Sequence, residues 1–373
     1  MNFRCCLCSV LALILIDSMD DALDTLASSF KRDLHVRFLQ MMMESLPLEY
    51  ELQDINRLTL AYFVISGLDI LGALGSVERD RVVDWVLSLQ ALSATTEDLK
   101  EGQFYGFLGC SNSKFPTASP DVSCISTSNL ASTYCALCIL KTVGYDLKNV
   151  NCTAISISMQ CLQQPDGSFM PIDTGAERDL RFVFCAAAVC HMLNDWSGMD
   201  KNRAKKFILS CQSYDGGFGL TPGSESHGGG TYCAVAALKL MGFINDGPLS
   251  SLTESIDFNL PLLLEWSLQR QAVDGGFQGR SNKASDSCYA FWVGAVLKLL
   301  GAENFLDKDA LRGFLFSCQT KYGGFSKFPG DLPDLYHAYF SFSAFSLLEE
   351  PGLNRISAEL GITVLSAMGT LSG

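Results

Sequence analysis

The sequence predicts an all-α protein folded as an α/α barrel, with an inner ring of helices inside an outer ring. The first observation is an internal repeat. A Gln is followed six positions later by a Phe that ends a Gly-containing turn, and this occurs at 163–169, 212–218, 271–277 and 319–325. The four phenylalanines are 49, 59 and 48 residues apart. A period near 50 residues is typical of stacked supersecondary units.

The second observation is an alternation of two kinds of helical run. Runs before the Gln are amphipathic, at 206–211, 262–268 and 311–318. Runs after the turn are apolar on nearly every face, at 58–74, 130–143, 180–193, 231–241, 288–300 and 337–348. A helix that is apolar all round is buried. Six buried helices favour a closed barrel over an open solenoid, in which each helix would need only one apolar stripe.

Composition limits the classes of function. Hydrophobic residues make up 48% of the 373 residues and charged residues 18%, so much of the chain is expected to be buried. The net charge of −13 argues against a nucleic-acid partner and favours a basic protein or basic substrate tail. The 15 cysteines, many within apolar runs, are typical of reduced thiols in a cytoplasmic protein.

One folded domain is expected. Residues 1–30 are interpreted as a disordered or artefactual leader, and residues 31–373 as a single α/α-barrel domain. The apolar run at 5–16 is too short to cross a bilayer, and no later run reads as a transmembrane segment.

Three candidate metal ligands fall at matching places of two repeats. Asp286 and Cys288 lie nine and eleven residues after Phe277, and His337 lies twelve residues after Phe325. Inner helices start at these places, so the three side chains are expected at one rim of the barrel. Three protein ligands with an open fourth position are typical of catalytic zinc, which could bind a substrate thiol and lower its pKa. The alternative is a buried core cysteine and an unrelated surface histidine.

A candidate diphosphate site lies beside these ligands. Arginine binds phosphate oxygens in bidentate fashion, lysine acts as a point charge, and histidine and tyrosine donate hydrogen bonds. Helix N-termini also favour anions. The candidates on this rim are His227, Arg280, Lys283 and Tyr289. The alternative is a set of ordinary loop charges.

Aromatic residues on the inner helices could line an isoprenoid pocket or simply fill the core, and periodicity does not distinguish the two. They are Phe63, Phe184, Phe291 and Trp292.

Several long segments resemble the β subunits of protein prenyltransferases, and among them the type I geranylgeranyltransferases. The resemblance covers about residues 32–355. It rests on RDLHVRF (32–38), RLTLAYFVISGLDIL (57–71), DLRFVFCAA (179–187), WSGMD (196–200), GSESHGG (223–229), GGFQGRSNKASDSCYAFWVGAVLKLL (275–300) and PDLYHAYF (333–340).

The resemblance implies a prenyltransferase-like α/α toroid that forms an obligate heterodimer with a helical α subunit, of the kind that is shared with farnesyltransferase. It implies transfer of a C20 geranylgeranyl group from geranylgeranyl diphosphate to the cysteine of CaaX proteins such as small GTPases, typically those ending in Leu. It also implies one zinc ion bound by Asp286, Cys288 and His337, and a diphosphate bound by His227, Arg280, Lys283 and Tyr289.

The resemblance assigns further roles residue by residue. Lys327 matches a lysine that takes the place of a magnesium-binding Asp of the farnesyl enzyme, so magnesium is not expected to be required. Glu177 and Arg181 match residues near the CaaX carboxylate. The isoprenoid is expected against Thr59, Phe63, Gly230 and Trp292, and the farnesyl enzyme carries a bulky Trp where Thr59 stands.

Two positions depart from the family pattern. Asn129 stands where the family usually has a His near the peptide terminus. Tyr336 is bulkier than the Leu of animal type I enzymes and resembles the farnesyl form. The alternatives are therefore a farnesyltransferase β subunit, with a C15 donor, and a non-catalytic helical scaffold.

Overall fold

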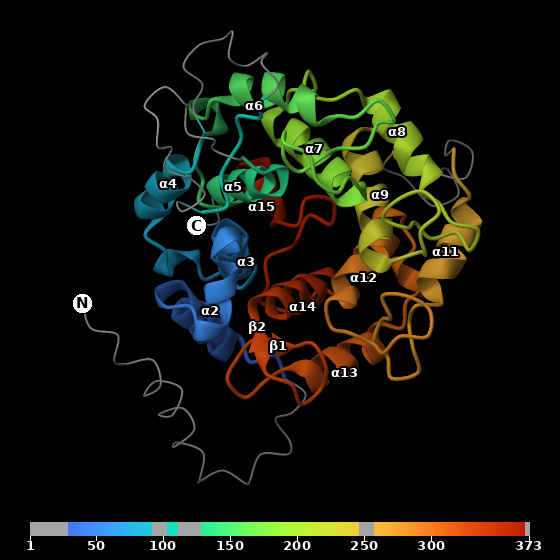
Figure 1. The fold of residues 1–373 in the computed structure, drawn as a ribbon. Helices are drawn as coiled ribbons and strands as arrows, with labels where there is room; N and C mark the ends of the chain where they lie inside the picture. The colour runs from blue at the N-terminus through green and yellow to red at the C-terminus, as the bar shows by residue number, and fades with distance from the viewer. Residues whose placement is uncertain (1–28, 92–102, 111–127, 246–256, 370–373) are drawn as a thin grey trace.

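Two concentric rings of helices make up the computed structural model, which describes residues 29–91, 103–110, 128–245 and 257–369 (Figure 1). The inner ring is α3 (Arg57–Ile70), α5 (Leu130–Thr142), α7 (Leu180–Leu193), α9 (Gly228–Leu240), α12 (Tyr289–Leu299) and α14 (Leu335–Leu347). The outer ring is α2 (Arg32–Glu44), α4 (Arg79–Ser88), α6 (Cys152–Met159), α8 (Lys201–Ser210), α11 (Leu260–Leu268) and α13 (Lys308–Cys318).

The inner ring is closed. Each inner helix contacts the next in chain order, and α14 contacts α3. The predicted α/α barrel is therefore confirmed, and the open solenoid is not the fold. The predicted inner runs agree with the observed helices to within a few residues, and the run at 180–193 coincides with α7. Within the described residues, no helix is both long enough and apolar enough to cross a membrane.

Short elements join the rings. The 3-10 helices are η1 (Leu48–Asn56), η2 (Leu74–Ser76), η5 (Leu147–Asn149), η6 (Gln160–Leu162) and η7 (Glu303–Phe305). Strands β1 (Phe325–Ser326) and β2 (Pro333–Asp334) pair antiparallel, with Phe325 opposite Asp334. The last helix is α15 (Val364–Met368).

The repeat glutamines connect consecutive outer helices through what we call the glutamine clamp. The side-chain amide of Gln163 donates to Asp200 O at 3.0 Å and accepts from Asp200 N at 2.7 Å. Gln212 binds both backbone groups of Asn259 in the same way, and Gln271 those of Asp307. Asp200, Asn259 and Asp307 are the N-caps of α8, α11 and α13. Each repeat thereby fixes where the next outer helix begins.

A glycine in each turn lets the clamp close. A Cβ on Gly167 would lie 2.1 Å from Arg203 O, in the first turn of α8. Gly167 has φ of +94°, which also favours glycine. The Phe that ends each turn is completely buried, as seen for Phe169, Phe218, Phe277 and Phe325.

The fourth clamp closes the ring onto the start of the chain. Gln319 accepts from Lys31 N at 2.9 Å, and Lys31 is the N-cap of α2. The side-chain amide of Gln319 also donates to Ser29 O. Of the expected leader 1–30, only Ser29 and Phe30 lie within the described residues, and Phe30 packs against Phe325 and other buried rings. Packing of the domain thus begins slightly before the expected boundary at residue 31.

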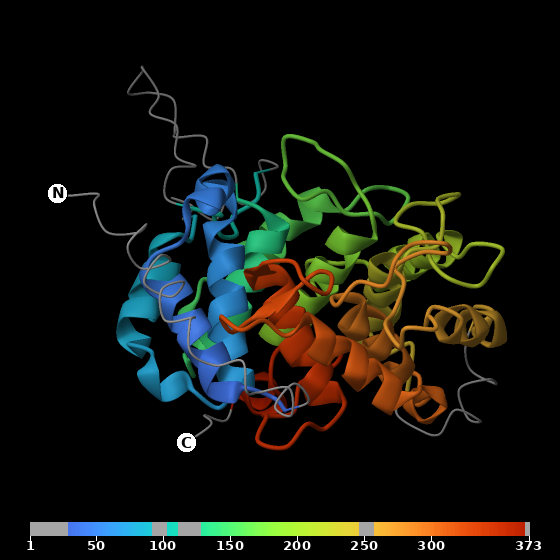
Figure 2. The ribbon, with the colours of Figure 1, turned by 90° about the horizontal axis from the view of Figure 1, so that it is seen from below.

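After α14 the chain turns back into the barrel (Figures 1 and 2). Ile356 pairs with Thr363, which makes residues 356–363 a hairpin. The base of this hairpin is attached to the end of α3, because Thr363 and Ser366 donate hydroxyl hydrogen bonds to the buried Asp69 carboxylate. In the side view, the C-terminal segment (red) lies at the lower end of the barrel, and the loops leading into α7 and α9 lie toward the upper end.

His35 on α2 stabilises the closure of the ring through two hydrogen bonds that require its neutral form. Gly324 N donates to its Nδ1 at 2.9 Å, so the proton of the neutral ring is on Nε2, which donates to Gln319 Oε1 at 2.9 Å. The ring is fully buried. Burial lowers the pKa of His35 to about 4, against the hydrogen bond to Gln319, which raises it.

The ring closure is expected to weaken in acid. The folded pKa of His35 lies below the ordinary value of 6.5, so its contribution is complete above pH 6.5 and is lost as pH falls toward 4. Between pH 7.5 and 5.0 the loss is roughly 2 kcal/mol of unfolding free energy. A His35→Gln variant lacks this titration. Its unfolding free energy should therefore fall by roughly 2 kcal/mol less than that of the wild type between pH 7.5 and 5.0. Denaturant unfolding at both pH values measures the difference, and equal losses in the two proteins would contradict the assignment.

Candidate active site

Asp286, Cys288 and His337 come together at the upper rim of the barrel. Their ligand atoms all lie within 4.8 Å of one another, and His337 Nε2 lies 3.3 Å from Asp286 Oδ1. Cys288 is the N-cap of α12, and His337 lies in the first turn of α14. Asp286 Oδ1 accepts from Cys288 N at 3.0 Å, which directs the carboxylate toward the thiol. The three candidate ligands, which come from two repeats, therefore lie together as the sequence predicts.

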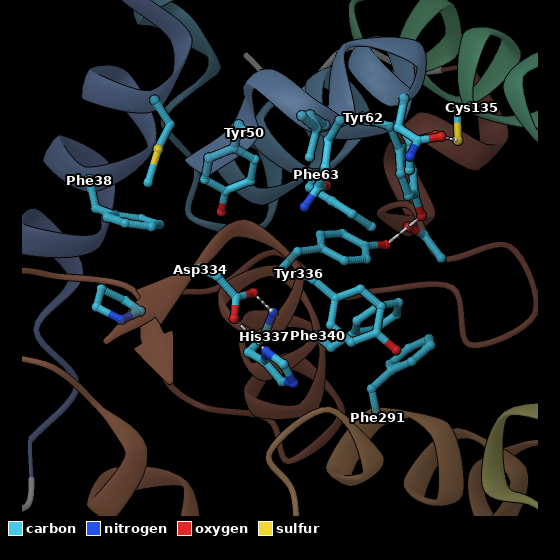
Figure 3. Close-up of a pocket in the computed structure, with 18 of the residues that line it drawn as sticks. Phe38, Tyr50, Tyr62, Phe63, Cys135, Phe291, Asp334, Tyr336, His337 and Phe340 are labelled. Atoms are coloured by element: carbon cyan, nitrogen blue, oxygen red, sulfur yellow. Dashed lines mark hydrogen bonds and ion pairs between the residues drawn. The ribbon is translucent and has the colours of Figure 1, made fainter. Parts of the chain in front are cut away.

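Asp334 orients the histidine, as Figure 3 shows. Its Oδ1 accepts from His337 N at 2.8 Å, and its Oδ2 lies 2.6 Å from His337 Nδ1. Nδ1 therefore carries a proton and donates to Asp334, so Nε2 is the ring nitrogen that faces Asp286 and Cys288. A carboxylate behind a histidine is the usual outer-shell arrangement of metal sites.

The three groups shift one another's pKa values. Burial alone would raise the pKa of Asp286, but hydrogen bonds from His337 and Cys288 lower it. Burial and the Asp286 charge raise the pKa of the Cys288 thiol far above its usual range. Burial alone would lower the pKa of His337, but Asp286 and Asp334 raise it to about 9.

The cluster fits a zinc-type ion. Thiolate, imidazole and carboxylate are the donor set that zinc prefers, and three of them leave a position open. A divalent cation would favour the thiolate of Cys288, against burial and the Asp286 charge, and the neutral ring of His337, against the charges of Asp286 and Asp334. Among the described residues this is the one group of three or more His, Cys, Asp and Glu side chains with such spacing.

His227 and Tyr289 form a second pair beside this cluster. Gly229 N donates to His227 Nδ1 at 3.1 Å, and His227 Nε2 lies 3.0 Å from the Tyr289 hydroxyl. Burial and the neighbouring Arg280 lower the pKa of His227, so the ring is neutral at pH 7. Its proton is then on Nε2 and is donated to the Tyr289 oxygen. The hydroxyl proton of Tyr289 is left to donate to an incoming acceptor.

The three predicted cations lie around these groups in different ways. Lys327 Nζ is 3.9 Å from Asp286 Oδ2, with a half-exposed side chain. Arg280 is paired with Glu225 at 2.8 Å on the surface. Lys283 is exposed. Two solvent-exposed partners gain little from pairing, so Arg280 can exchange Glu225 for a ligand anion at small cost.

A cavity of about 1410 Å³ extends from the rim into the barrel, and Figure 3 shows part of its wall. His337 lines both this cavity and the three-donor cluster. Seven rings form an unbroken circle around the cavity, each with its centroid 5.0–5.7 Å from the next. We call this circle the aromatic belt, and its members are Tyr62, Tyr134, Phe184, Tyr232, Phe291, Phe340 and Tyr339.

Residues expected at the isoprenoid do line the cavity, with one exception. Thr59, Phe63 and Trp292 are in its wall. Gly230 is not: a Cβ there would lie 2.9 Å from Phe218 O, so its small size permits a close backbone approach and does not enlarge the cavity. Tyr336 also lines the cavity, where its hydroxyl accepts from Trp292 Nε1 at 3.1 Å.

Of the residues expected near the CaaX peptide terminus, Arg181 lines the cavity, whereas the side chain of Asn129 caps a helix. Arg181 lines the cavity, and its guanidinium binds Asp179 at 2.6 Å and Glu177 at 2.8 Å. Hydrogen bonds to Asp179, against burial, raise the pKa of Arg181. Asn129 caps α5, accepting from Ala131 N and Ser132 N. Its side chain is thus used by the helix.

The cavity wall also contains three thiols, Cys135, Cys185 and Cys233. No two of the described cysteines form a disulfide with each other, in agreement with the reduced cysteines expected from the sequence. Burial raises the pKa of Cys135 and of Cys233 to about 12, and it also raises the pKa of Cys185 well above its usual range.

Sequence reasoning missed Asp334, the belt tyrosines and the hairpin that reaches the cavity floor. Asp334 could have been found from its spacing, because an Asp three residues before a helical His can cap the helix and reach the ring. Tyr62, Tyr134, Tyr232 and Tyr339 share one position, the fifth or sixth residue of an inner helix, and this regularity was a usable signal.

Comparison with known proteins agrees with the fold and site. Residues 30–362 match the family model of the prenyltransferase alpha-alpha toroid domain. The geranylgeranyl transferase type-1 subunit beta of Arabidopsis thaliana is 59% identical over 92% of each chain, and that of Dictyostelium discoideum is 34% identical over 92% of this chain and 97% of its own. The structure of Candida albicans protein geranylgeranyltransferase-I complexed with GGPP superposes with a TM-score of 0.77 at 25% identity, covering 91% of this chain and 98% of that one.

The chain therefore belongs to the prenyltransferase family whose members carry the alpha-alpha toroid domain. Within this family its resemblance to the type-1 geranylgeranyl transferase β subunits, expected from the sequence, is confirmed.

Asp334 is expected to tighten metal binding without being a ligand. Replacing it with Asn removes the negative charge behind His337 and lets the ring reorient, so zinc affinity should fall on the order of 10- to 100-fold. Competition with a chromophoric chelator measures the affinity. Asp331→Asn, an exposed residue of the same loop, is the matched control and should bind as the wild type does. Equal affinities of the Asp334 variant and the wild type would contradict the orienting role.

Proposed function

We propose that this chain is the catalytic β subunit of a heterodimeric protein geranylgeranyltransferase type I. It transfers the C20 group of geranylgeranyl diphosphate to the cysteine thiol of proteins that end in a CaaX motif, typically with Leu last. One observation carries the proposal: His337 belongs both to the three-donor cluster and to the wall of an aromatic cavity. A site for activating a thiol thus opens directly onto a site for a long apolar chain.

In this proposal Asp286, Cys288 and His337 hold one zinc ion. When bound, the ion supplies a positive charge that lowers the pKa of a substrate thiol at the open position. Asp334 keeps His337 Nε2 available by accepting the Nδ1 proton. The substrate loses its thiol proton, its sulfur forms a bond to C1 of the donor, and the C1–oxygen bond breaks to release diphosphate.

The rim residues bind and stabilise the departing diphosphate. The Tyr289 proton, free because His227 donates to the Tyr289 oxygen, is available to a phosphate oxygen. Arg280 and Lys283 add positive charge from the same loop, and Arg280 leaves Glu225 to do so. Lys327, close to Asp286, supplies a fixed cation where charge develops, so magnesium is not needed.

The cavity holds the isoprenoid and the peptide side by side. Thr59 is small and leaves depth for the fourth isoprene unit, with Phe63 and Trp292 packing on the chain. Arg181, held by Asp179 and Glu177, faces the carboxyl end of the CaaX peptide. The partner is a helical prenyltransferase α subunit, and CaaX proteins such as small GTPases are modified in the cytoplasm.

A farnesyltransferase β subunit is the second candidate, favoured by one residue. Tyr336 occupies cavity space beside Phe340 and Phe63 and resembles the farnesyl form. Its hydroxyl is held by Trp292, so the ring is fixed in the cavity. Tyr336 therefore reduces the cavity volume available to the prenyl chain, whereas the small side chain of Thr59 increases it.

Donor choice tests the proposal. The chain is co-expressed with a prenyltransferase α subunit and offered C15 and C20 diphosphates with a CaaX peptide ending in Leu, with zinc and with or without magnesium. We expect preferred C20 transfer that persists without magnesium. Preferred C15 transfer would establish the farnesyl alternative, and bound zinc without transfer of either donor would contradict the catalytic proposal.

Thr59 is expected to set the preference. Thr59→Trp fills the cavity beside Cys135, so kcat/KM should shift toward the C15 donor by about tenfold or more, since loss of a buried isoprene unit removes several methylene-sized contributions. Thr59→Ser keeps a small side chain and a hydroxyl, and should retain C20 preference. Parallel kcat/KM measurements with both donors provide the comparison. Undiminished C20 preference in Thr59→Trp would refute this role.

A further inference from the structure

The C-terminal hairpin reaches the cavity as well as closing the barrel. Its turn, residues 357–362, is here called the C-terminal tip. Ser357 N donates to Ile362 O at 2.8 Å, and Gly361 N donates to Ser357 O at 3.0 Å, so the tip is a tight turn. Gly361 is a lining residue of the same cavity that contains Thr59 and His337. A segment outside the helical repeat thus forms part of the cavity wall.

Three tyrosines of the aromatic belt hold the tip. The hydroxyls of Tyr62 and Tyr339 donate to Gly361 O, the first at 2.7 Å, and the hydroxyl of Tyr134 donates to Leu360 O at 2.7 Å. These tyrosines come from the adjacent helices α14, α3 and α5 and are buried. Each satisfies its hydroxyl on the tip backbone, which a buried polar group requires.

The tip is seated as closely as a backbone allows. A Cβ on Gly361 would lie 2.8 Å from the Tyr62 hydroxyl oxygen, 3.1 Å from that of Tyr134 and 3.2 Å from that of Tyr339. Gly361 has φ of +69°, which also disfavours a side chain. The absence of a side chain here allows the carbonyls to reach the belt.

The belt is therefore divided into two unlike halves. On one side, three hydroxyls are engaged by the tip. On the other side are Phe184, Phe291 and Phe340, whose rings have no polar group, and Tyr232, whose hydroxyl makes no hydrogen bond to the tip among the described residues. An isoprenoid has no hydrogen-bonding group with which to displace the tip, so it cannot take the space that the tip fills beside the three tyrosines.

We propose that the C-terminal tip is a length stop for the prenyl donor, held in the tyrosine half of the aromatic belt by the hydroxyls of Tyr62, Tyr134 and Tyr339. The inference rests on the proposed function and adds a second determinant of lipid length to Thr59. Thr59 decides whether a chain longer than C15 enters, and the tip decides where a longer chain ends. A donor one isoprene unit beyond C20 meets the tip and fits poorly.

The hydroxyls can be removed without detaching the hairpin. Its base remains attached to α3, because Thr363 and Ser366 bind the Asp69 carboxylate and Asn354 donates to Asp69 O at 2.7 Å. Tyr→Phe changes keep the rings of the belt in place. The double variant Tyr62→Phe/Tyr134→Phe therefore releases the tip selectively.

The experiment uses the heterodimer of this chain with a prenyltransferase α subunit. It compares kcat/KM for C20 and C25 diphosphates, and hydrogen exchange of residues 357–362. In the double variant we expect the C25-to-C20 ratio to rise at least about fivefold, with faster exchange of the tip, because two hydrogen bonds to it are lost. The comparison variant is Tyr232→Phe, which also changes the cavity wall but removes no hydrogen bond to the tip within the described residues. Whatever its effect on the C20 rate, it should leave the C25-to-C20 ratio within about twofold of wild type.

Each result decides the inference. An unchanged ratio in the double variant, or unchanged exchange of the tip, overturns it. An equal rise in Tyr232→Phe also overturns it, because the width of the belt would then be the cause. If the double variant does not assemble, Tyr134→Phe alone is judged by the same criteria. Wild-type failure to transfer C20 would instead refute the proposed function, and exchange in the variants would still test whether the tyrosines hold the tip.

Discussion

The two-way hydrogen bond between a repeat glutamine and the residue before the next outer helix is the constraint on which the architecture depends. Each of the first three clamps uses a side-chain amide to bind both backbone groups of one residue, so it specifies a position and an orientation together. A slip of one residue would break both hydrogen bonds of a clamp at once, so each clamp favours one register. The register of the outer ring is thereby transmitted from repeat to repeat. At the fourth clamp it returns to α2, with His35 as a second contact.

A fixed register explains why the site can be built from distant segments. The inner helices begin at the same height because the turns before them are equivalent, so Asp286 and Cys288 from one repeat meet His337 from the next. No single segment supplies the donor cluster. The same rule places aromatic rings from all six inner helices at a common level, two of them from α14, and these rings form the belt around the cavity. Ligand cluster and lipid-sized cavity are two consequences of one repeat.

The repeat also explains which features could be predicted from the sequence. Helix type, ring closure and the meeting of Asp286, Cys288 and His337 follow from periodicity, and periodicity is visible in the sequence. Gly230 could not be interpreted correctly, because a small side chain suits both an open cavity and a close backbone approach. The C-terminal tip carries no repeat signal, so nothing local indicated that Gly361 would enter the barrel. The Asp334–His337 contact depends on a side-chain direction set by the cap of α14, which spacing alone only permits.

The thiols in the cavity wall have a consequence for chemical selectivity. An allylic diphosphate held beside Cys135, Cys185 and Cys233 is an alkylating agent next to three potential nucleophiles of the protein itself. Only a thiolate attacks readily, and burial keeps these thiols protonated far above neutral pH. The apolar wall thus holds the lipid and also keeps its own sulfurs unreactive. An enzyme that alkylates thiols would in this way avoid inactivating itself, because the low polarity that attracts the donor also suppresses the competing reaction.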